Sequence, residues 1–115
     1  MKKFIKSVGY AVNGIVAALK DQRNLAIQSV IAIAVIAAGF YFGITSIEWC
    51  IILILIGTVL SLELMNSALE ELVNLVTKEK HPLAGKVKDI AAGAVLVFSV
   101  IAGIVGIIIF AKYIF

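Results

Sequence analysis

The stretch SLELMNSALEELVN, residues 61–74, decides the fold of this chain, because polar side chains enter it directly after a long apolar run. Residues 49–62 are predominantly apolar, and no Gly or Pro interrupts the chain between Thr58 and His81. Fourteen residues are short for a membrane span, which needs about 20. We therefore expect one long helix over about 47–76, whose first part crosses the bilayer and whose last part projects from it.

Polar side chains of this helix fall on one stripe when residues are spaced at about 100°. The stripe contains Glu63, Asn66, Glu70 and Asn74, with Ser67 beside it. The helix rises about 21 Å from Trp49 to Glu63, within a hydrocarbon core of about 30 Å. Glu63 should therefore lie inside the membrane near one surface, and Glu70 at the boundary. A carboxylate at that depth normally faces a bundle interior or a polar cavity. Glu71, about 80° away, is expected to be solvated.

The other apolar segments complete an all-α membrane protein with three transmembrane helices. The chain has 115 residues, enough for one domain (1–115), and is 63% hydrophobic with a mean hydropathy of +1.14. Spans are expected at about 25–44, 47–76 and 90–113. Apolar residues at helical spacing predict an amphipathic surface helix over about 4–20 rather than a signal peptide. These residues are Phe4, Val8, Val12, Ile15 and Leu19.

The basic residues flank the spans, and none occurs between Arg23 and Lys78. This distribution argues against a nucleic-acid-binding patch. Excess Lys and Arg mark the cytoplasmic side, so the N-terminus and the 78–88 connection should be inside, and the 45–48 turn and the C-terminus outside. The single Cys, Cys50, excludes an internal disulfide. The aromatic residues expected near the outer boundary are Tyr41, Trp49 and Tyr113.

The segment KEKHPLAGKVKDIAAGAVL, residues 78–96, is expected to be a basic loop followed by Lys88 and Asp89 at the mouth of the last span. Lysines near carboxylates at a membrane surface suit a phosphate group with a divalent cation. Simple anchoring at the surface also explains Lys86 and Lys88. His81 is expected to be a solvated loop residue.

LELMNSALEELVN followed by HPLAGKVKDIAAGAVL resembles the prokaryotic diacylglycerol kinase family of small integral-membrane lipid kinases. The GYAVNG segment at 9–14 is similar to that family's surface helix, and the resemblance covers nearly the whole chain. It implies three transmembrane helices plus a surface helix in a bacterial cell membrane, assembled as a homotrimer with shared active sites. It also implies phosphorylation of a lipid alcohol by ATP with Mg²⁺.

The resemblance also implies a role for each residue that matches the family pattern. Glu63 corresponds to the general base, and Glu70 to a metal ligand. Asn66 would orient the reacting groups, Lys88 would contact the transferring phosphate, and Asp89 would order Lys88. The surface-helix residues that would approach the nucleotide are Lys3, Lys6 and Tyr10.

Two positions depart from the family pattern. The family has a Glu that helps to bind metal where this chain has Gln22, with Asp21 adjacent. Gln offers an oxygen but no charge, which should weaken Mg²⁺ binding unless Asp21 substitutes. An Asp of the family is Asn74 here. These changes leave open an altered or inactive relative.

The favoured function is phosphorylation of undecaprenol to undecaprenyl phosphate, because Pro82 and the Ala-Ala-Gly-Ala run resemble the undecaprenol kinase branch. The alternative is a diacylglycerol kinase that produces phosphatidic acid. Two remote alternatives are a non-catalytic membrane scaffold and a small ion-path subunit that uses Glu63 and Asn66. The ion path requires polar groups in the outer halves of the spans, where little beyond Tyr41, Thr58 and Ser99 occurs.

Overall fold

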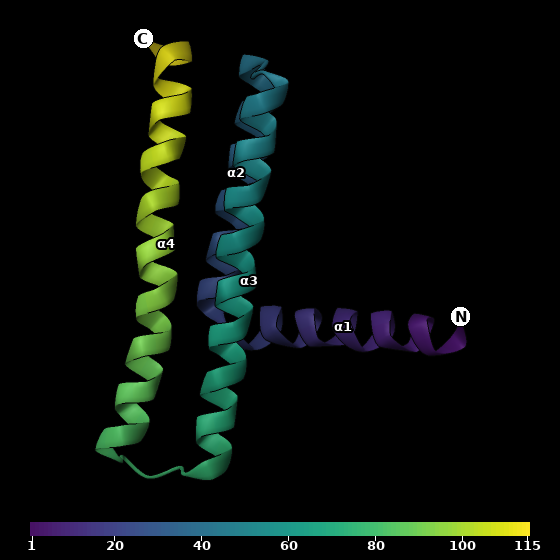
Figure 1. Ribbon diagram of the computed structural model, residues 1–115, viewed down its shortest axis with the longest axis vertical. Helices are drawn as coiled ribbons and strands as arrows, with labels where there is room; N and C mark the ends of the chain where they lie inside the picture. The colour runs from purple at the N-terminus through teal and green to yellow at the C-terminus, as the bar shows by residue number, and fades with distance from the viewer.

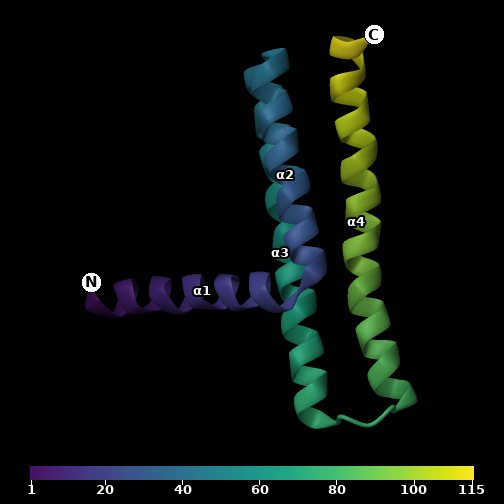
Figure 2. The same cartoon turned by 180° about the vertical axis from the view of Figure 1, so that it is seen from behind.

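The computed structural model describes all residues 1–115, which form four helices and no strands. They are α1 (Lys2–Asp21), α2 (Arg23–Phe42), α3 (Ser46–Val76) and α4 (Pro82–Ile114). α2, α3 and α4 run lengthwise along one another, whereas α1 projects sideways from this bundle (Figures 1 and 2). The last three helices are long and apolar enough to cross a membrane. The expected all-α fold with three spans is therefore confirmed, and the homotrimer stays a prediction.

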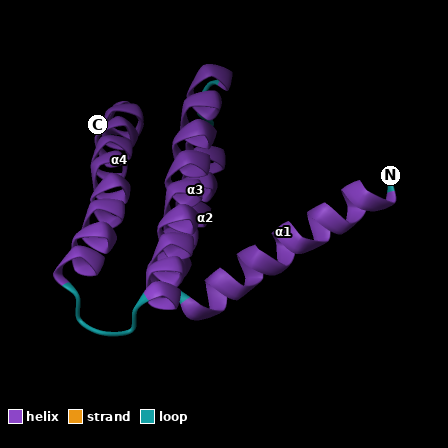
Figure 3. Ribbon diagram, turned by 60° about the horizontal axis from the view of Figure 1, so that its bottom comes forward, coloured by secondary structure: helices purple, strands orange, loops and turns teal.

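A single residue, Gln22, separates α1 from α2. Its backbone is extended (φ −113°, ψ 109°), so the chain leaves one helix and begins the next in a new direction. α1 has no buried residue and points away from the other helices (Figure 3). Its apolar and polar faces therefore have no partner within the chain along most of its length, as expected for an amphipathic helix that lies at a membrane surface.

The α2–α3 turn is set by local chemistry. Gly43 ends α2 in the left-handed region (φ 63°), which glycine adopts without strain. Thr45 then caps α3: its Oγ1 accepts from the N–H of Glu48, and the Glu48 carboxylate accepts from the N–H of Thr45. Gly39 allows the close approach of Trp49, since an added Cβ would lie 2.7 Å from the indole ring.

The α3–α4 connection is shorter than the sequence suggests. The expected basic loop over 78–88 is wrong in its second half, because α4 begins at Pro82 and carries Lys86 and Lys88. Proline is favoured in the first turn of a helix, and Nδ1 of His81 accepts from the N–H of Leu83 at 3.1 Å. His81 thus caps the helix while it remains exposed.

Burial within the chain is unusual in its chemistry. Most large apolar side chains are exposed, as expected for helices that face lipid. The small apolar core of Ile44, Ile52 and Ile109 lies near the α2–α3 turn. The buried polar residues are all on α3: Glu48, Glu63, Asn66 and Ser67.

These residues belong to two ends of the bundle. We call the end with the α2–α3 turn and the C-terminus the turn end, and the end with the 77–81 connection the loop end (Figure 1). Glu48 lies at the turn end. The carboxylates predicted to be functional lie on the part of α3 that leads to the loop end.

Candidate active site

Glu63 is the most deeply buried polar residue of the chain, with 2% of its surface exposed. Nε2 of Gln28 on α2 donates a hydrogen bond to its Oε2 at 3.3 Å. Its backbone carbonyl accepts from the hydroxyl of Ser67 at 3.0 Å, which satisfies that hydroxyl inside the helix. The predicted burial of Glu63 toward the bundle is therefore confirmed, and its partner is a neutral amide rather than a cation.

Asn66 lies one turn farther along α3 and is 6% exposed. Its Nδ2 donates to Oε1 of the half-buried Glu70 at 3.4 Å, whereas its Oδ1 is buried without a hydrogen-bond partner. Buried polar atoms without partners are rare in folded proteins and call for an explanation. Asn66 and Glu70 together present oxygen atoms close to the loop end of the stripe, while Glu71 is exposed as expected.

Lys88 contacts α3 from the facing helix. Its Nζ donates a hydrogen bond to Oδ1 of Asn74 at 2.7 Å. The last polar residue of the α3 stripe therefore binds the lysine for which the family resemblance implies a phosphate contact. Asp89, the adjacent residue, is exposed. From the sequence, Asn74 was placed on the polar stripe and noted for the charge that it lacks, but it was given no partner. Its pairing with Lys88 could have been anticipated from the antiparallel hairpin of α3 and α4, whose short connection brings these positions together.

A basic cavity of about 420 Å³ lies beside this pair at the loop end. Asn74 and Lys88 line it together with the 77–81 connection, and further lysines and the helix-capping histidine complete its wall. The residues with basic side chains in its lining are Lys78, Lys80, His81 and Lys88. Glu79 also lines this cavity, but three lysines outnumber the one carboxylate, so the cavity suits an anion.

The surface helix contributes two separate regions. Lys3, Lys6 and Tyr10 are exposed on the half of α1 that extends away from the bundle, so within one chain they are not brought to Glu63 or Lys88 (Figures 1 and 3).

At the other end of α1, a cavity of about 510 Å³ separates it from α3. Asp21, Gln22 and Glu71 line this cavity, but Glu70 does not. No group of three or more His, Cys, Asp or Glu side chains within the chain could hold a metal ion.

An apolar cavity of about 380 Å³ lies among α2, α3 and α4, deeper in the bundle. Nine of its twelve lining residues are hydrophobic, and the other three are Gln28, Ser99 and Gly103. Oε1 of Gln28 and Oγ of Ser99 are both buried without partners. Sequence reasoning missed Gln28, because a lone glutamine in an apolar span gives no sign of which helix it faces.

The fold and the site define a class of protein: an integral membrane protein in which one helix carries a stripe of carboxylates and amides. A lysine of the facing helix contacts this stripe, which leads to a basic cavity at one end of the bundle. The sequence model described as prokaryotic diacylglycerol kinase matches residues 9–110, and the chain belongs to this family. It is therefore a lipid kinase.

Relatives with two different names are similar to the chain. The undecaprenol kinase of Bacillus subtilis is 46% identical over 110 residues, which cover 96% of this chain and 89% of the relative. The diacylglycerol kinase of Haemophilus influenzae is 33% identical over 108 residues, with 92% of each chain covered. The diacylglycerol kinase of Escherichia coli is 26% identical over 100 residues, which cover 87% of this chain and 82% of the relative.

Proposed function

We propose that the protein phosphorylates undecaprenol to undecaprenyl phosphate with ATP as the donor. The observation that carries the proposal is the Glu63 carboxylate, which is buried in a membrane-spanning helix and accepts a hydrogen bond from Gln28, a residue that lines the apolar cavity. A base at this depth can meet a hydroxyl whose hydrocarbon chain stays in lipid. The similarity to the undecaprenol kinase of Bacillus subtilis favours undecaprenol, and the similarity to the diacylglycerol kinases supports diacylglycerol as the alternative substrate.

In the proposed reaction, Glu63 accepts the proton of the lipid hydroxyl. The hydroxyl oxygen forms a bond to the γ-phosphorus of ATP while the bond between that phosphorus and the β–γ bridging oxygen breaks, which releases ADP. Proton acceptance by a positioned side chain contributes about 10²–10⁴-fold to such reactions. Glu63 is well placed for this role, because it has no cation partner that would compete for its negative charge.

Lys88 is proposed to contact the transferring phosphate. An ammonium group has three donors, so Lys88 can keep its hydrogen bond to Asn74 and still donate to phosphate oxygens. Asn74 is neutral, which leaves the positive charge of Lys88 free to attract an anion. Asp89 is proposed to order this region through the charge that it adds next to Lys88.

Glu70 and Asn66 fit a Mg²⁺ ion in their donor chemistry. Mg²⁺ prefers oxygen ligands and is commonly bound through one or two carboxylates together with substrate phosphates. Glu70 supplies a carboxylate, and the buried Oδ1 of Asn66 is an oxygen without a partner. When bound, the ion would neutralise phosphate charge as it develops. Gln22 and Asp21 are weaker candidates, because they line a cavity with Glu71 rather than Glu70.

The remaining parts of the proposal need more than one chain. Lys3, Lys6 and Tyr10 could approach a nucleotide in a homotrimer whose active sites are shared, since α1 reaches outward from its own bundle (Figure 2). The distribution of basic residues supports an orientation with the N-terminus and the loop end in the cytoplasm, where ATP is available, and the C-terminus outside. The protein would then reside in the bacterial cell membrane.

The test is phosphate transfer from labelled ATP to a panel of lipid alcohols by the purified protein with saturating Mg²⁺. We expect undecaprenyl phosphate to be the dominant product. Phosphatidic acid as the dominant product would move the protein to the alternative function. If no lipid is phosphorylated, the departures at Gln22 and Asn74 have produced an inactive relative, and the proposed function is wrong.

A further inference from the structure

Gln28 connects the apolar cavity with the proposed base. α2 carries its side chain into the cavity wall, and its Nε2 donates to Glu63 Oε2 at 3.3 Å. This is the one hydrogen bond to that carboxylate from another helix. Glu63 takes part in no ion pair. The orientation of its carboxylate relative to α2 therefore depends on a single neutral amide.

The chemistry of the two groups fixes which end of the amide faces Glu63. An ionised carboxylate only accepts hydrogen bonds, so the NH₂ group of Gln28 must face it and the carbonyl must face away. Oε1 is accordingly left buried without a partner. Such an atom is costly, because it lost its water on folding.

An apolar side chain at position 28 would line the cavity without this cost. Ile31, Ala32 and Val35 do so on the same helix. The feature of Gln28 that an apolar residue lacks is its N–H group, and the atom that receives the N–H is on Glu63. The unpartnered carbonyl thus indicates that the amide serves the carboxylate rather than the packing of the cavity.

We propose that Gln28 is a positioning residue, which holds the Glu63 carboxylate toward the substrate hydroxyl at the edge of the apolar cavity. The proposal rests on the proposed role of Glu63 as the base. Without Gln28, the flexible glutamate side chain has donors only on its own helix, such as the amide of Asn66 one turn away. Small misplacements of a reacting group cost rate out of proportion to their size, about 100-fold for about 1 Å. A neutral donor fixes the carboxylate and leaves its charge uncompensated.

Three substitutions test the proposal in the full-length protein, with the lipid alcohol that gives the most product. Gln28→Met keeps the length of the side chain but removes the donor, and we expect kcat to fall about tenfold or more with little change in the KM for the lipid. Gln28→His keeps an N–H group at a similar reach and should recover much of the lost rate. Ser99→Ala is the matched control, because it removes the other unpartnered polar atom of the cavity wall and does not contact Glu63.

The proposal is wrong if Gln28→Met turns over at the wild-type rate, if Gln28→His is as slow as Gln28→Met, or if Ser99→Ala loses as much kcat as Gln28→Met. Thermal unfolding in detergent shows whether each variant is folded. Should Gln28→Met not fold, Gln28→Asn takes its place: its shorter amide cannot span the same gap, and a wild-type kcat for it also overturns the proposal.

Glu63→Gln, measured alongside, distinguishes a failure of the proposed base from a failure of the proposed positioning residue. If Glu63→Gln remains active, Glu63 is not the base and both proposals are wrong. If Glu63→Gln is inactive while Gln28→Met is fully active, only the positioning role of Gln28 is wrong.

Discussion

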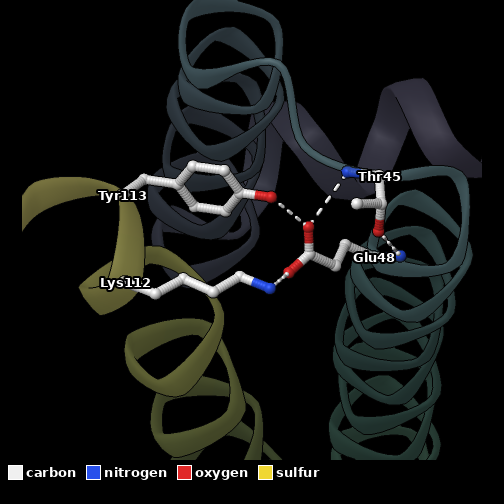
Figure 4. Close-up of polar contacts among 4 residues, drawn as sticks. All are labelled: Thr45, Glu48, Lys112 and Tyr113. Atoms are coloured by element: carbon white, nitrogen blue, oxygen red, sulfur yellow. Dashed lines mark hydrogen bonds and ion pairs between the residues drawn. The ribbon is translucent and has the colours of Figure 1, made fainter.

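The two polar clusters of α3 differ in how completely their hydrogen bonds are satisfied. At the turn end, the Glu48 carboxylate forms an ion pair with Lys112 of α4. It also accepts hydrogen bonds from the hydroxyl of Tyr113 and from the backbone N–H of Thr45 (Figure 4). Toward the loop end, the Glu63 carboxylate accepts one hydrogen bond from another helix, and its donor is the neutral amide of Gln28. Near it, Oε1 of Gln28 and Oδ1 of Asn66 have no partners.

This difference is the one we expect between a structural cluster and the proposed reactive one. A carboxylate that is paired with a cation and accepts from two further donors stabilises one arrangement of helices and has little remaining capacity for a ligand. Glu48 therefore fastens the C-terminal end of α4 to the α2–α3 turn. A buried site with unpartnered polar atoms is costly to the fold, and such costs concentrate where a substrate or an ion supplies the missing partners.

The largest expected effect comes from removing the charge at each cluster in turn. Glu63→Gln should lower kcat by about 10²–10⁴-fold, since the proposed base is lost, and leave the unfolding temperature unchanged or raised because a buried charge disappears. Glu48→Gln should do the reverse: it lowers the unfolding temperature and changes kcat little, because Lys112 loses its anionic partner while the amide oxygen can accept from only part of the former donors. Both variants are measured by phosphate transfer and by thermal unfolding in the same detergent.

The opposite pattern would break the comparison. If Glu48→Gln loses activity while it stays folded and stable, the turn-end cluster takes part in the reaction. Glu71→Gln is the matched control for Glu63→Gln, because it removes an exposed carboxylate from the same helix. We expect it to change neither quantity.

The features that could be predicted from the sequence are those that depend on a single helix. The uninterrupted run through residues 61–74 fixes the length of α3, and the spacing of Glu63, Asn66 and Glu70 places them on one face. Contacts between helices depend on how the helices rotate about their axes, which apolar spans hardly encode. Gln28 was missed for this reason, whereas the pairing of Lys88 with Asn74 was missed although the short α3–α4 connection brings the two positions together.

The turn-end cluster was missed because its members are far apart in the chain. Tyr113 was interpreted as an interfacial aromatic, and Lys112 only interrupts an apolar span. The structure brings both to Glu48, 64 and 65 residues earlier in the sequence. Only the capping box of Thr45 and Glu48 has a local signature, in which a Thr precedes a Glu by three residues.

A smaller effect is expected at Gln22, where the proposed metal site lacks the charge of a carboxylate. Gln22→Glu adds a carboxylate to the cavity that Asp21 and Glu71 already line, which should lower the Mg²⁺ concentration for half-maximal activity. We expect a change of about 10-fold, in the lower part of the range over which groups around a metal site alter its affinity. The measurement is a Mg²⁺ titration of phosphate transfer at saturating ATP.

The same titration on Gln22→Glu combined with Glu71→Gln decides which α3 carboxylate the added group works with. If the gain survives the loss of Glu71, the partner is Glu70, as proposed. If the gain disappears, the ion binds in the cavity between α1 and α3. An unchanged titration for Gln22→Glu alone would mean that Asp21 already supplies the missing charge.

The smallest effect is expected at Asn74, the polar residue of the stripe nearest the loop end. Asn74→Asp gives Lys88 an anionic partner where it now has an amide oxygen at 2.7 Å. An ion pair in this exposed region is worth only about 0.2–1 kcal/mol, which corresponds to a change of about 1.4- to 5-fold in an equilibrium constant. Because the new carboxylate competes with phosphate for the same ammonium group, the KM for ATP should rise by a factor in that range, and the rise should shrink at high salt.

Asn74→Ala removes the partner without adding charge and should leave the KM lower than in Asn74→Asp. Steady-state kinetics at two ionic strengths distinguish these outcomes. A KM that falls in Asn74→Asp would show that Lys88 needs a fixed anionic partner to reach the phosphate. The loop end would then resemble the turn end, where the charged groups are paired, rather than the region around Glu63, where polar atoms lack partners.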